Sequence, residues 1–367
     1  MLTPEHEAIR MAVREFAEQE VAPIADRHDR ENREIPTDIL KRMAELGYFG
    51  LTIPEAYGGL GLDYASMAIV AEELSRAWLS VGSVMTRNLI TGTLLLAHGT
   101  EEQKQRFLPG IAGGDLLTAA AFTEPDAGSD TAAISTRAVR HADEYLVTGA
   151  KTWCTIANRA HILTTLVRTD PDPAKRHKGL SILLIQKEPG DGFDPPAIAG
   201  EPIPTIGYHG MTSFSLSFDR CPVPAKNLIG EREHQGFYQL MATYESARLQ
   251  TAARAVGVAQ AAYEAALTYA KQRVQFGQPI SNFPSSATGG TRGCSGSSRG
   301  RRRSSARSLR SASCKADRSA KRRANPAWTT ERPPSLSLSP VGERARVRVD
   351  GRLSVVGFSF DIERSDG

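Results

Sequence analysis

The chain has 367 residues, of which 40% are hydrophobic and 23% charged, and its formal net charge is +4. That composition is ordinary for a globular protein with two or three domains. No apolar run approaches the roughly 20 residues of a membrane helix, and the four cysteines show neither a zinc-site nor a disulfide spacing. We therefore expect a cytoplasmic protein with no metal.

The charge is divided unevenly along the chain. Residues 284–367 hold 18 Lys and Arg against 7 Asp and Glu, whereas the preceding residues hold 27 against 34. The last 84 residues are rich in Arg and Ser and have no sustained hydrophobic period. Such a segment buries too little apolar surface to offset its ordering entropy, so we expect a disordered tail over 284–367.

The first third of the chain is patterned as helices. Residues 3–30 begin with Thr-Pro-Glu, and apolar residues then recur at helical spacing. Further helices are predicted over 36–47, 63–78, 82–98 and 101–113, with Gly and Pro between them. We assign an N-terminal helical domain to residues 1–115.

The pattern changes to short strands after Gly113-Gly114-Asp115. Segments such as EYLVTGAKTWCT and SFSLSFDRCPV are rich in Val, Thr and Phe and are bounded by turn residues. Their spacing predicts a central β-domain over 116–232, built as a small barrel or sandwich.

A single long helix is predicted over 236–273, where no Pro occurs between Pro224 and Pro279. Leu249, Val256 and Tyr263 belong to an apolar stripe that needs covering by neighbouring helices. Those neighbours do not follow in the sequence. Residues 233–283 therefore read as the start of a C-terminal helical bundle that is truncated.

Two stretches carry chemistry. AFTEPDAGSD (121–130) ends a strand in a Gly-Ser-Asp turn, whose backbone N–H groups either close an ordinary turn or form a nest for a phosphate. GAKTWCTIA (149–157) places Trp153 and Thr155 in a strand, where they either fill a core or face a flat ring system.

Five motifs together resemble the acyl-CoA dehydrogenase family. They are IPEAYGGLGLDY (53–64), GTEEQKQRFLPGIAGG (99–114), AFTEPDAGSD, KTWCT and RVQFGQPI (273–280), in the family's order and at its spacing. The resemblance covers residues 1–283. It implies an N-terminal helical domain, a central β-domain, a C-terminal four-helix domain and the cofactor FAD.

The resemblance also implies which residues meet the cofactor and the substrate. The flavin ring would lie against the first strand end and the KTWCT strand, the pyrophosphate and the pantetheine arm would lie on the turn, and RVQF would reach the FAD of a neighbouring subunit. The implied cofactor-binding residues are Phe122, Thr123, Gly128, Ser129, Trp153, Thr155, Arg273 and Phe276, and the implied substrate-binding residues are Ser129 and Arg248.

The implied reaction is α,β-dehydrogenation of an acyl-CoA, in which a carboxylate removes the α-proton. In most of the family this base is a Glu in a C-terminal Tyr-Glu-Gly-Thr-like motif, which the sequence lacks. A minority place it on the long helix, directly before the position of Arg248, where this chain has Ala247. Glu245 is two residues earlier, roughly 200° around the helix, and is a weak substitute. We therefore expect impaired activity.

The expected substrate is a short or branched acyl-CoA. YESARLQTAARAVGVAQ, KGLSILL and TIGYHGM are similar to the methylsuccinyl-CoA dehydrogenase branch of the family. The implied electron acceptor is an electron-transfer flavoprotein, and the implied assembly is a homodimer or homotetramer that depends on an intact bundle.

Two other functions stay open on the sequence. One is an acyl-CoA oxidase-like flavoprotein. The other is an inactive relic whose basic tail binds polyanions, although the tail lacks the repeats and aromatic spacing of a specific nucleic-acid binder. We interpret the abrupt change after Phe283 as a shifted reading frame.

Overall fold

The computed structural model describes residues 2–194, 197–283, 348–349 and 352–353. Leu2–Pro279 form one unit, and the chain from Ile280 onward belongs to another. In the latter, the short helix η7 (Ile280–Asn282) and the antiparallel pair β10 (Arg348–Val349) and β11 (Arg352–Leu353) are described. The rest of the predicted disordered tail lies outside the described residues.

The N-terminal part is helical, as the sequence predicts. Its helices are α1 (Pro4–Phe16), α2 (Ala22–Arg30), α3 (Thr37–Glu45), α4 (Tyr64–Ala77), α5 (Leu79–His98) and α6 (Glu101–Gly113), with the π-helical turn η1 (Ala17–Val21) and the 3-10 turn η2 (Glu55–Tyr57). Capping boxes begin two of them: Thr100 Oγ1 accepts from Gln103 N at 3.3 Å, and Gln103 Oε1 accepts from Thr100 N at 3.1 Å. Among the described helices, none combines the length and apolar character needed to cross a membrane.

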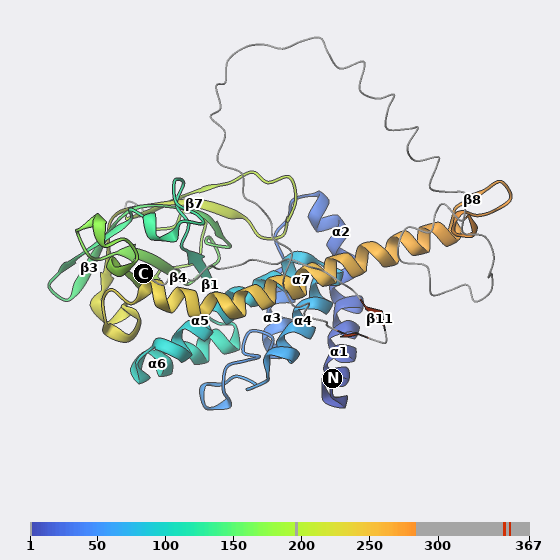
Figure 1. Ribbon diagram of the computed structural model, residues 1–367, viewed down its shortest axis with the longest axis horizontal. Helices are drawn as coiled ribbons and strands as arrows, with labels where there is room; N and C mark the ends of the chain where they lie inside the picture. The colour runs from blue at the N-terminus through green and yellow to red at the C-terminus, as the bar shows by residue number, and fades with distance from the viewer. Residues whose placement is uncertain (1, 195–196, 284–347, 350–351, 354–367) are drawn as a thin grey trace, which may run out of the picture. The chain divides into compact units, whose positions relative to one another are not determined.

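The middle of the chain is a curled sheet (Figure 1). Its strands are β1 (Thr118–Ala121), β2 (Arg137–His141), β3 (Glu144–Thr155), β4 (Ile162–Arg168), β5 (Leu180–Gln186), β6 (Ile198–Pro202) and β7 (Ser213–Pro224). They lie in the order β1-β4-β2-β3-β7-β6, with β5 paired to β4. β1 runs parallel to β4 from Thr118, which pairs with Ile162, and the long strands β3 and β7 are antiparallel.

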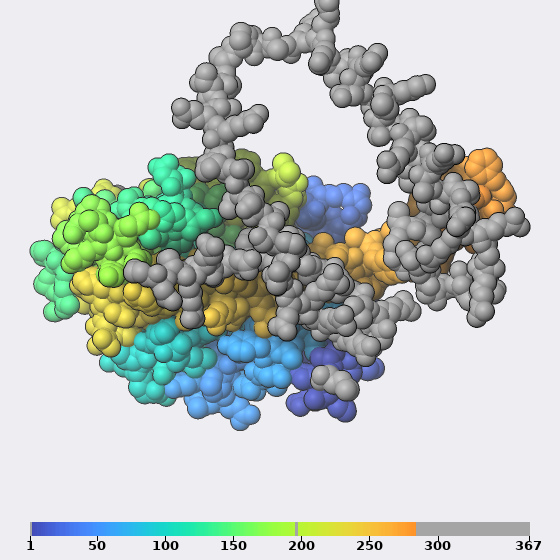
Figure 2. All heavy atoms as spheres, viewed as in Figure 1, coloured from blue at the N-terminus to red at the C-terminus, as the bar shows by residue number. Residues whose placement is uncertain are grey.

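The last long element is α7 (Gly236–Gln272), followed by the hairpin β8 (Val274–Gln275) and β9 (Gln278–Pro279). Figure 2 shows its yellow spheres at the surface between the green strands and the cyan helices, while its orange end extends to the right beyond the strands. Gly257 lets α7 approach α4 closely, because a Cβ there would meet Glu72 O at 2.2 Å. Backbone contact at this glycine therefore sets which face of α7 is buried.

That buried face differs from the apolar stripe in the sequence. Leu249, Val256 and Tyr263 are 41%, 49% and 41% exposed. The buried positions are mostly small or polar: Gly236, Gln239, Leu240, Thr243, Ser246, Gln250, Ala253 and Gly257. The stripe is thus uncovered in the described part of the chain, and no residue of α7 beyond Gly257 is buried.

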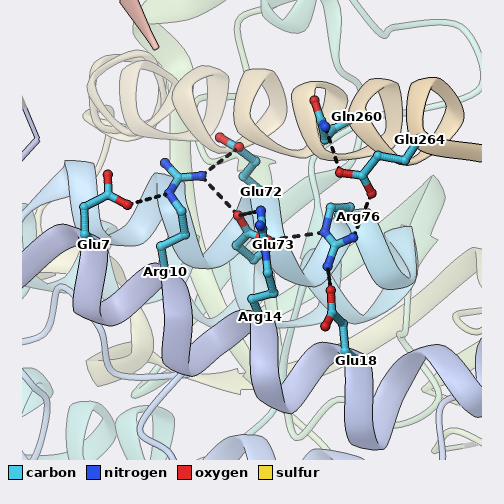
Figure 3. A network of polar contacts seen from close by, with 9 residues as sticks. All are labelled: Glu7, Arg10, Arg14, Glu18, Glu72, Glu73, Arg76, Gln260 and Glu264. Atoms are coloured by element: carbon cyan, nitrogen blue, oxygen red, sulfur yellow. Dashed lines mark hydrogen bonds and ion pairs between the residues drawn. The ribbon is translucent and has the colours of Figure 1, made fainter. Parts of the chain in front are cut away.

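An arginine–glutamate network joins α1, α4 and α7 (Figure 3). Its centre is Glu73, whose side chain is 1% exposed and accepts from Arg14 Nε at 2.9 Å and from Arg10 Nη1 at 3.0 Å. Arg76 Nε also reaches Glu73, at 3.3 Å, and Arg76 Nη1 donates to Glu264 of α7 at 2.9 Å. The network therefore holds the distal part of α7 against the N-terminal helices.

Glu73→Gln is expected to lower the free energy of unfolding by about 2 kcal/mol, because four charge-assisted hydrogen bonds from Arg10, Arg14 and Arg76 weaken at a buried site. Urea unfolding measures the loss. The matched control is Glu72→Gln, which removes a half-buried carboxylate paired with Arg10 and is expected to cost less than about 1 kcal/mol. Equal losses in the two variants would contradict a central role for Glu73.

Candidate active site

The turn after β1 is anchored by one buried carboxylate. Glu124 accepts hydrogen bonds from Ser135 N at 2.7 Å and Thr136 N at 2.9 Å. Lys151 Nζ donates to Glu124 Oε1 at 2.9 Å and to Phe122 O at 3.2 Å, and its side chain is fully buried. The pair thus ties β3 to the turn and fixes the backbone at Phe122.

The electrostatics of this pair keep Glu124 ionised. Burial acts to raise its pKa, but the charge of Lys151 and the hydrogen bonds from Thr136 and Ser135 outweigh burial and lower the pKa to about 2. For Lys151, burial is the dominant effect and lowers the pKa, with Glu124 opposing it. Each of the two buried side chains is therefore kept in its charged form by the charge of the other.

The two motifs of the sequence lie next to each other. Thr152 N donates to Thr123 O at 2.9 Å, which joins the KTWCT strand to the end of β1. A register shift between Lys151 and Cys154 interrupts the pairing of β3 with β7. At that irregularity Trp153 takes a φ of 57° and is 56% exposed.

A large side chain in this conformation is unusual, since positive φ is disfavoured for bulky residues and costs of order 1–3 kcal/mol. The strained backbone at Trp153 turns its indole out of the sheet. The neighbouring Cys154 is fully buried. Thr155 is 7% exposed, and its Oγ1 lies 3.0 Å from Ser213 Oγ. The arrangement presents a flat aromatic surface next to the turn.

The turn that follows β1 is exposed at its Gly-Ser pair. Gly128 and Ser129 are exposed. A Cβ on Gly128 would meet only Thr123 Cγ2, at 3.8 Å, so the packing of the chain itself does not require glycine there. The open room above these residues suits a bound phosphate group.

One face of α7 meets this region. Tyr244 packs edge-on against Phe122, with ring centroids 6.4 Å apart. Burial raises the pKa of Tyr244, and the charge of Arg248, one turn further on, opposes the rise. Ala247 and Arg248 follow Tyr244 by three and four residues and so share its face, whereas the exposed Glu245 does not.

Three family models match the chain in order. They are the acyl-CoA dehydrogenase N-terminal domain over residues 3–115, the middle domain over 119–221 and the C-terminal domain over 234–288. The chain belongs to the acyl-CoA dehydrogenase family.

Named relatives and solved structures agree. (2S)-methylsuccinyl-CoA dehydrogenase of Cereibacter sphaeroides is 48% identical over 286 residues, covering 77% of this chain and 52% of the relative. An acyl-CoA dehydrogenase of Bacillus subtilis (strain 168) is 38% identical over 280 residues, covering 76% and 72%. Butyryl-CoA dehydrogenase from Megasphaera elsdenii superposes with a TM-score of 0.72 at 30% identity, covering 78% and 74%. The chain therefore spans about half the length of the first relative.

As an acyl-CoA dehydrogenase family member, the chain brings some of its sequence-predicted site residues together and separates others. Phe122, Thr123, Trp153 and Thr155 gather at the β1–β3 junction, with Gly128 and Ser129 on the adjoining turn and Arg248 on α7. Arg273 and Phe276 are exposed at the far end of α7 (Figure 1). At 1.5 Å per residue they lie roughly 40 Å along the helix from Tyr244, too far to reach the same site.

The sequence did not single out the buried residues that support the candidate site of this family member. Glu124 and Lys151 lie inside the two motifs but were given no role of their own, yet they form one ion pair. The signal that was available is the position of Lys151, which falls at a buried place in β3. A lysine at such a place needs an anionic partner.

Proposed function

We propose that the chain binds FAD and catalyses the α,β-dehydrogenation of an acyl-CoA thioester. The observation that carries the proposal is Trp153, which is exposed at positive φ beside the turn that the Thr152–Thr123 hydrogen bond holds in place. A strained, exposed aromatic residue next to an exposed Gly-Ser turn fits a flat ring system joined to a pyrophosphate.

The residues have distinct parts in holding the cofactor. The indole of Trp153 would pack on the flavin ring, while Thr123 and Thr155 would offer hydrogen bonds to its edge. Gly128 and Ser129 would lie beside the pyrophosphate and the pantetheine arm of the substrate. When bound, FAD supplies the acceptor for the hydride that leaves the β-carbon. The Glu124–Lys151 pair keeps the turn in place by fixing the carbonyl of Phe122.

We propose a short or branched acyl-CoA as the substrate. Support comes from the 48% identity to a protein named (2S)-methylsuccinyl-CoA dehydrogenase. Arg248 lies on the face of α7 that meets Phe122 through Tyr244, where it supports the thioester end of the substrate. An electron-transfer flavoprotein is the proposed acceptor.

Removal of the α-proton is the weak step in this proposal. The position directly before Arg248, where some family members carry the base, is Ala247, and Glu245 is exposed on another face. With no carboxylate at this position of α7 among the described residues, removal of the α-proton is expected to be slow and turnover low. Arg273 and Phe276 resemble family residues that reach the FAD of a neighbouring subunit, so a homodimer or homotetramer belongs to the proposal.

The purified full-length chain is expected to take up FAD and show flavin absorption bands. Trp153→Ala should weaken FAD binding about tenfold or more, because it removes the aromatic contact. Fluorescence titration with FAD measures the change. The matched control is Tyr64→Ala, which removes another exposed aromatic side chain. A chain that takes up no FAD, or a Trp153→Ala variant that binds FAD as well as the control, would contradict the proposal.

A further inference from the structure

The loop between β6 and β7, residues 203–212, is fastened by the ring of one histidine. His209 Nδ1 lies 2.7 Å from Asp29 O, and His209 Nε2 lies 3.2 Å from Thr205 O. Asp29 belongs to α2, whereas Thr205 belongs to the loop itself. The ring therefore ties the loop both to an N-terminal helix and to the loop's own first half.

Both partners of the His209 ring are backbone carbonyl oxygens, which can only accept hydrogen bonds. A neutral imidazole has one N–H and one lone pair, so it can donate to one of the two carbonyls and its lone pair faces the other. The imidazolium ion donates from both ring nitrogens. The geometry therefore requires a proton on each ring nitrogen of His209.

The surroundings of His209 favour this charged ring. Its side chain is 19% exposed, and Asp29 Oδ1 lies 3.9 Å from Nδ1. Asp29 O is one of the last carbonyls of α2, where the negative end of the helix dipole attracts a cation. The hydrogen bonds to Thr205 and Asp29, followed by the charge of Asp29, outweigh burial and raise the pKa of His209 above the ordinary 6.5.

The other elements packed on the loop contact it through groups beside the ring. From α5, Ser80 Oγ donates to His209 O. From α7, Arg254 Nη1 donates to Tyr208 Oη at 3.2 Å, so this cation binds the neighbouring side chain. Among the described residues, Asp29 of α2 is the charged side chain that acts on the imidazole.

The backbone on either side of His209 lies against a buried tryptophan. Tyr208 has a φ of 65°, a conformation that a bulky residue keeps only where its surroundings enforce it. A Cβ on Gly210 would meet Trp78 Cζ2 at 2.6 Å, so the loop lies directly on the indole. Trp78 is 6% exposed, packs on the ring of His28 and lines a cavity of about 420 Å³ together with Tyr208. Movement of the loop would therefore uncover Trp78.

The end of the loop reaches the candidate active site. Ile156 N donates to Thr212 O at 2.7 Å, and Ile156 directly follows Thr155. Ser213 Oγ, at the start of β7, lies 3.0 Å from Thr155 Oγ1. A change in the loop would therefore be felt by the strand that carries Trp153.

We propose that His209 is a pH-sensitive strap, which holds residues 203–212 closed over Trp78 while its ring carries both protons. When the ring releases one proton to solvent, one of its two hydrogen bonds is lost, and the loop opens. The contribution of the strap is complete below the ordinary value of 6.5 and is lost as the pH rises through the raised pKa of the folded chain. The strap follows from the fold and does not depend on the proposed function.

NMR spectra of the histidine ring nitrogens in the full-length chain test the protonation directly. The pH is varied between about 5 and 9, which brackets the ordinary pKa of histidine. The signals of His209 are those that disappear in His209→Gln. Their midpoint is expected above 6.5. A midpoint at or below 6.5 would overturn the strap.

Acrylamide quenching of Trp78 fluorescence tests the opening of the loop. The double variant Trp153→Phe/Trp328→Phe leaves Trp78 as the only tryptophan of the chain. Quenching is expected to rise with pH at the same midpoint as the His209 signals, because the indole becomes exposed. Quenching that stays constant across this midpoint would show that the loop remains closed, and the strap would be refuted.

Three further substitutions in this single-tryptophan background identify the titrating group. His209→Gln should be quenched strongly at every pH, since it has no paired donors, and His209→Arg should stay protected, since it keeps donors and charge. The exposed His141→Gln is the matched control and should behave as its parent. If His209→Gln or His209→Arg keeps the parent's pH dependence, another group causes the opening and the inference fails.

Discussion

The Ala247→Glu variant is expected to turn over an acyl-CoA about 10²–10⁴ times faster than the unsubstituted chain, the usual contribution of a positioned general base. Ala247 is half-buried on the face of α7 that carries Tyr244, and Tyr244 packs on Phe122 at the end of β1. A carboxylate at this position would therefore project toward the proposed flavin and thioester region. Anaerobic loss of flavin absorption after addition of the acyl-CoA measures the rate.

The matched control is Ala247→Gln, which has nearly the same shape and cannot accept the α-proton. If both variants react at the rate of the unsubstituted chain, then Ala247 does not face the substrate. If both variants react faster by the same factor, then side-chain packing at position 247, and not removal of the α-proton, limits the rate. Only a gain confined to Ala247→Glu supports a missing base.

Lys151→Met is expected to lower the free energy of unfolding by about 3–5 kcal/mol, because it leaves the buried charge of Glu124 without its cation. The double variant Glu124→Gln/Lys151→Met removes both charges and should be more stable than the single variant. Urea unfolding of the three proteins gives the comparison. A cost below about 1 kcal/mol for Lys151→Met would show that the pair does not hold the turn.

The same pair gives a specific dependence on pH. The pKa of Glu124 falls from an ordinary 4.5 to about 2 on folding. Its stabilising contribution is therefore complete above about pH 5 and is lost as the pH falls through 4.5 toward 2, a difference of about 3 kcal/mol. Between pH 5 and 2, Glu124→Gln should lose less stability than the unsubstituted chain by about this amount.

Local signals in the sequence predicted the elements well. Thr100 and Gln103 cap the start of α6 through hydrogen bonds between residues three positions apart. The start of this helix can therefore be predicted from the local sequence alone. The length of α7 follows from an uninterrupted run without proline. Turn and strand residues also mark the two motifs AFTEPDAGSD and KTWCT, which the structure places side by side, and their part in cofactor binding stays a prediction.

Features set by packing between distant segments could not be predicted. The buried face of α7 depends on the approach of Gly257 to Glu72 O, which places Leu249 and Val256 outside. The outward turn of Trp153 depends on a register shift between β3 and β7. The Glu124–Lys151 pair joins residues that no spacing rule connects, so each looked ordinary by itself.

The Arg76–Glu264 contact has a consequence for the order in which the molecule forms. Its partners are 188 positions apart in the sequence. At a synthesis rate of 5–20 residues per second, roughly 10–40 s pass between the appearance of α4 and that of the α7 segment that covers it. During this interval the face of α4 destined for α7 is available to chaperones and to other nascent chains. The N-terminal helices must therefore tolerate an open surface until the chain has been made as far as Glu264.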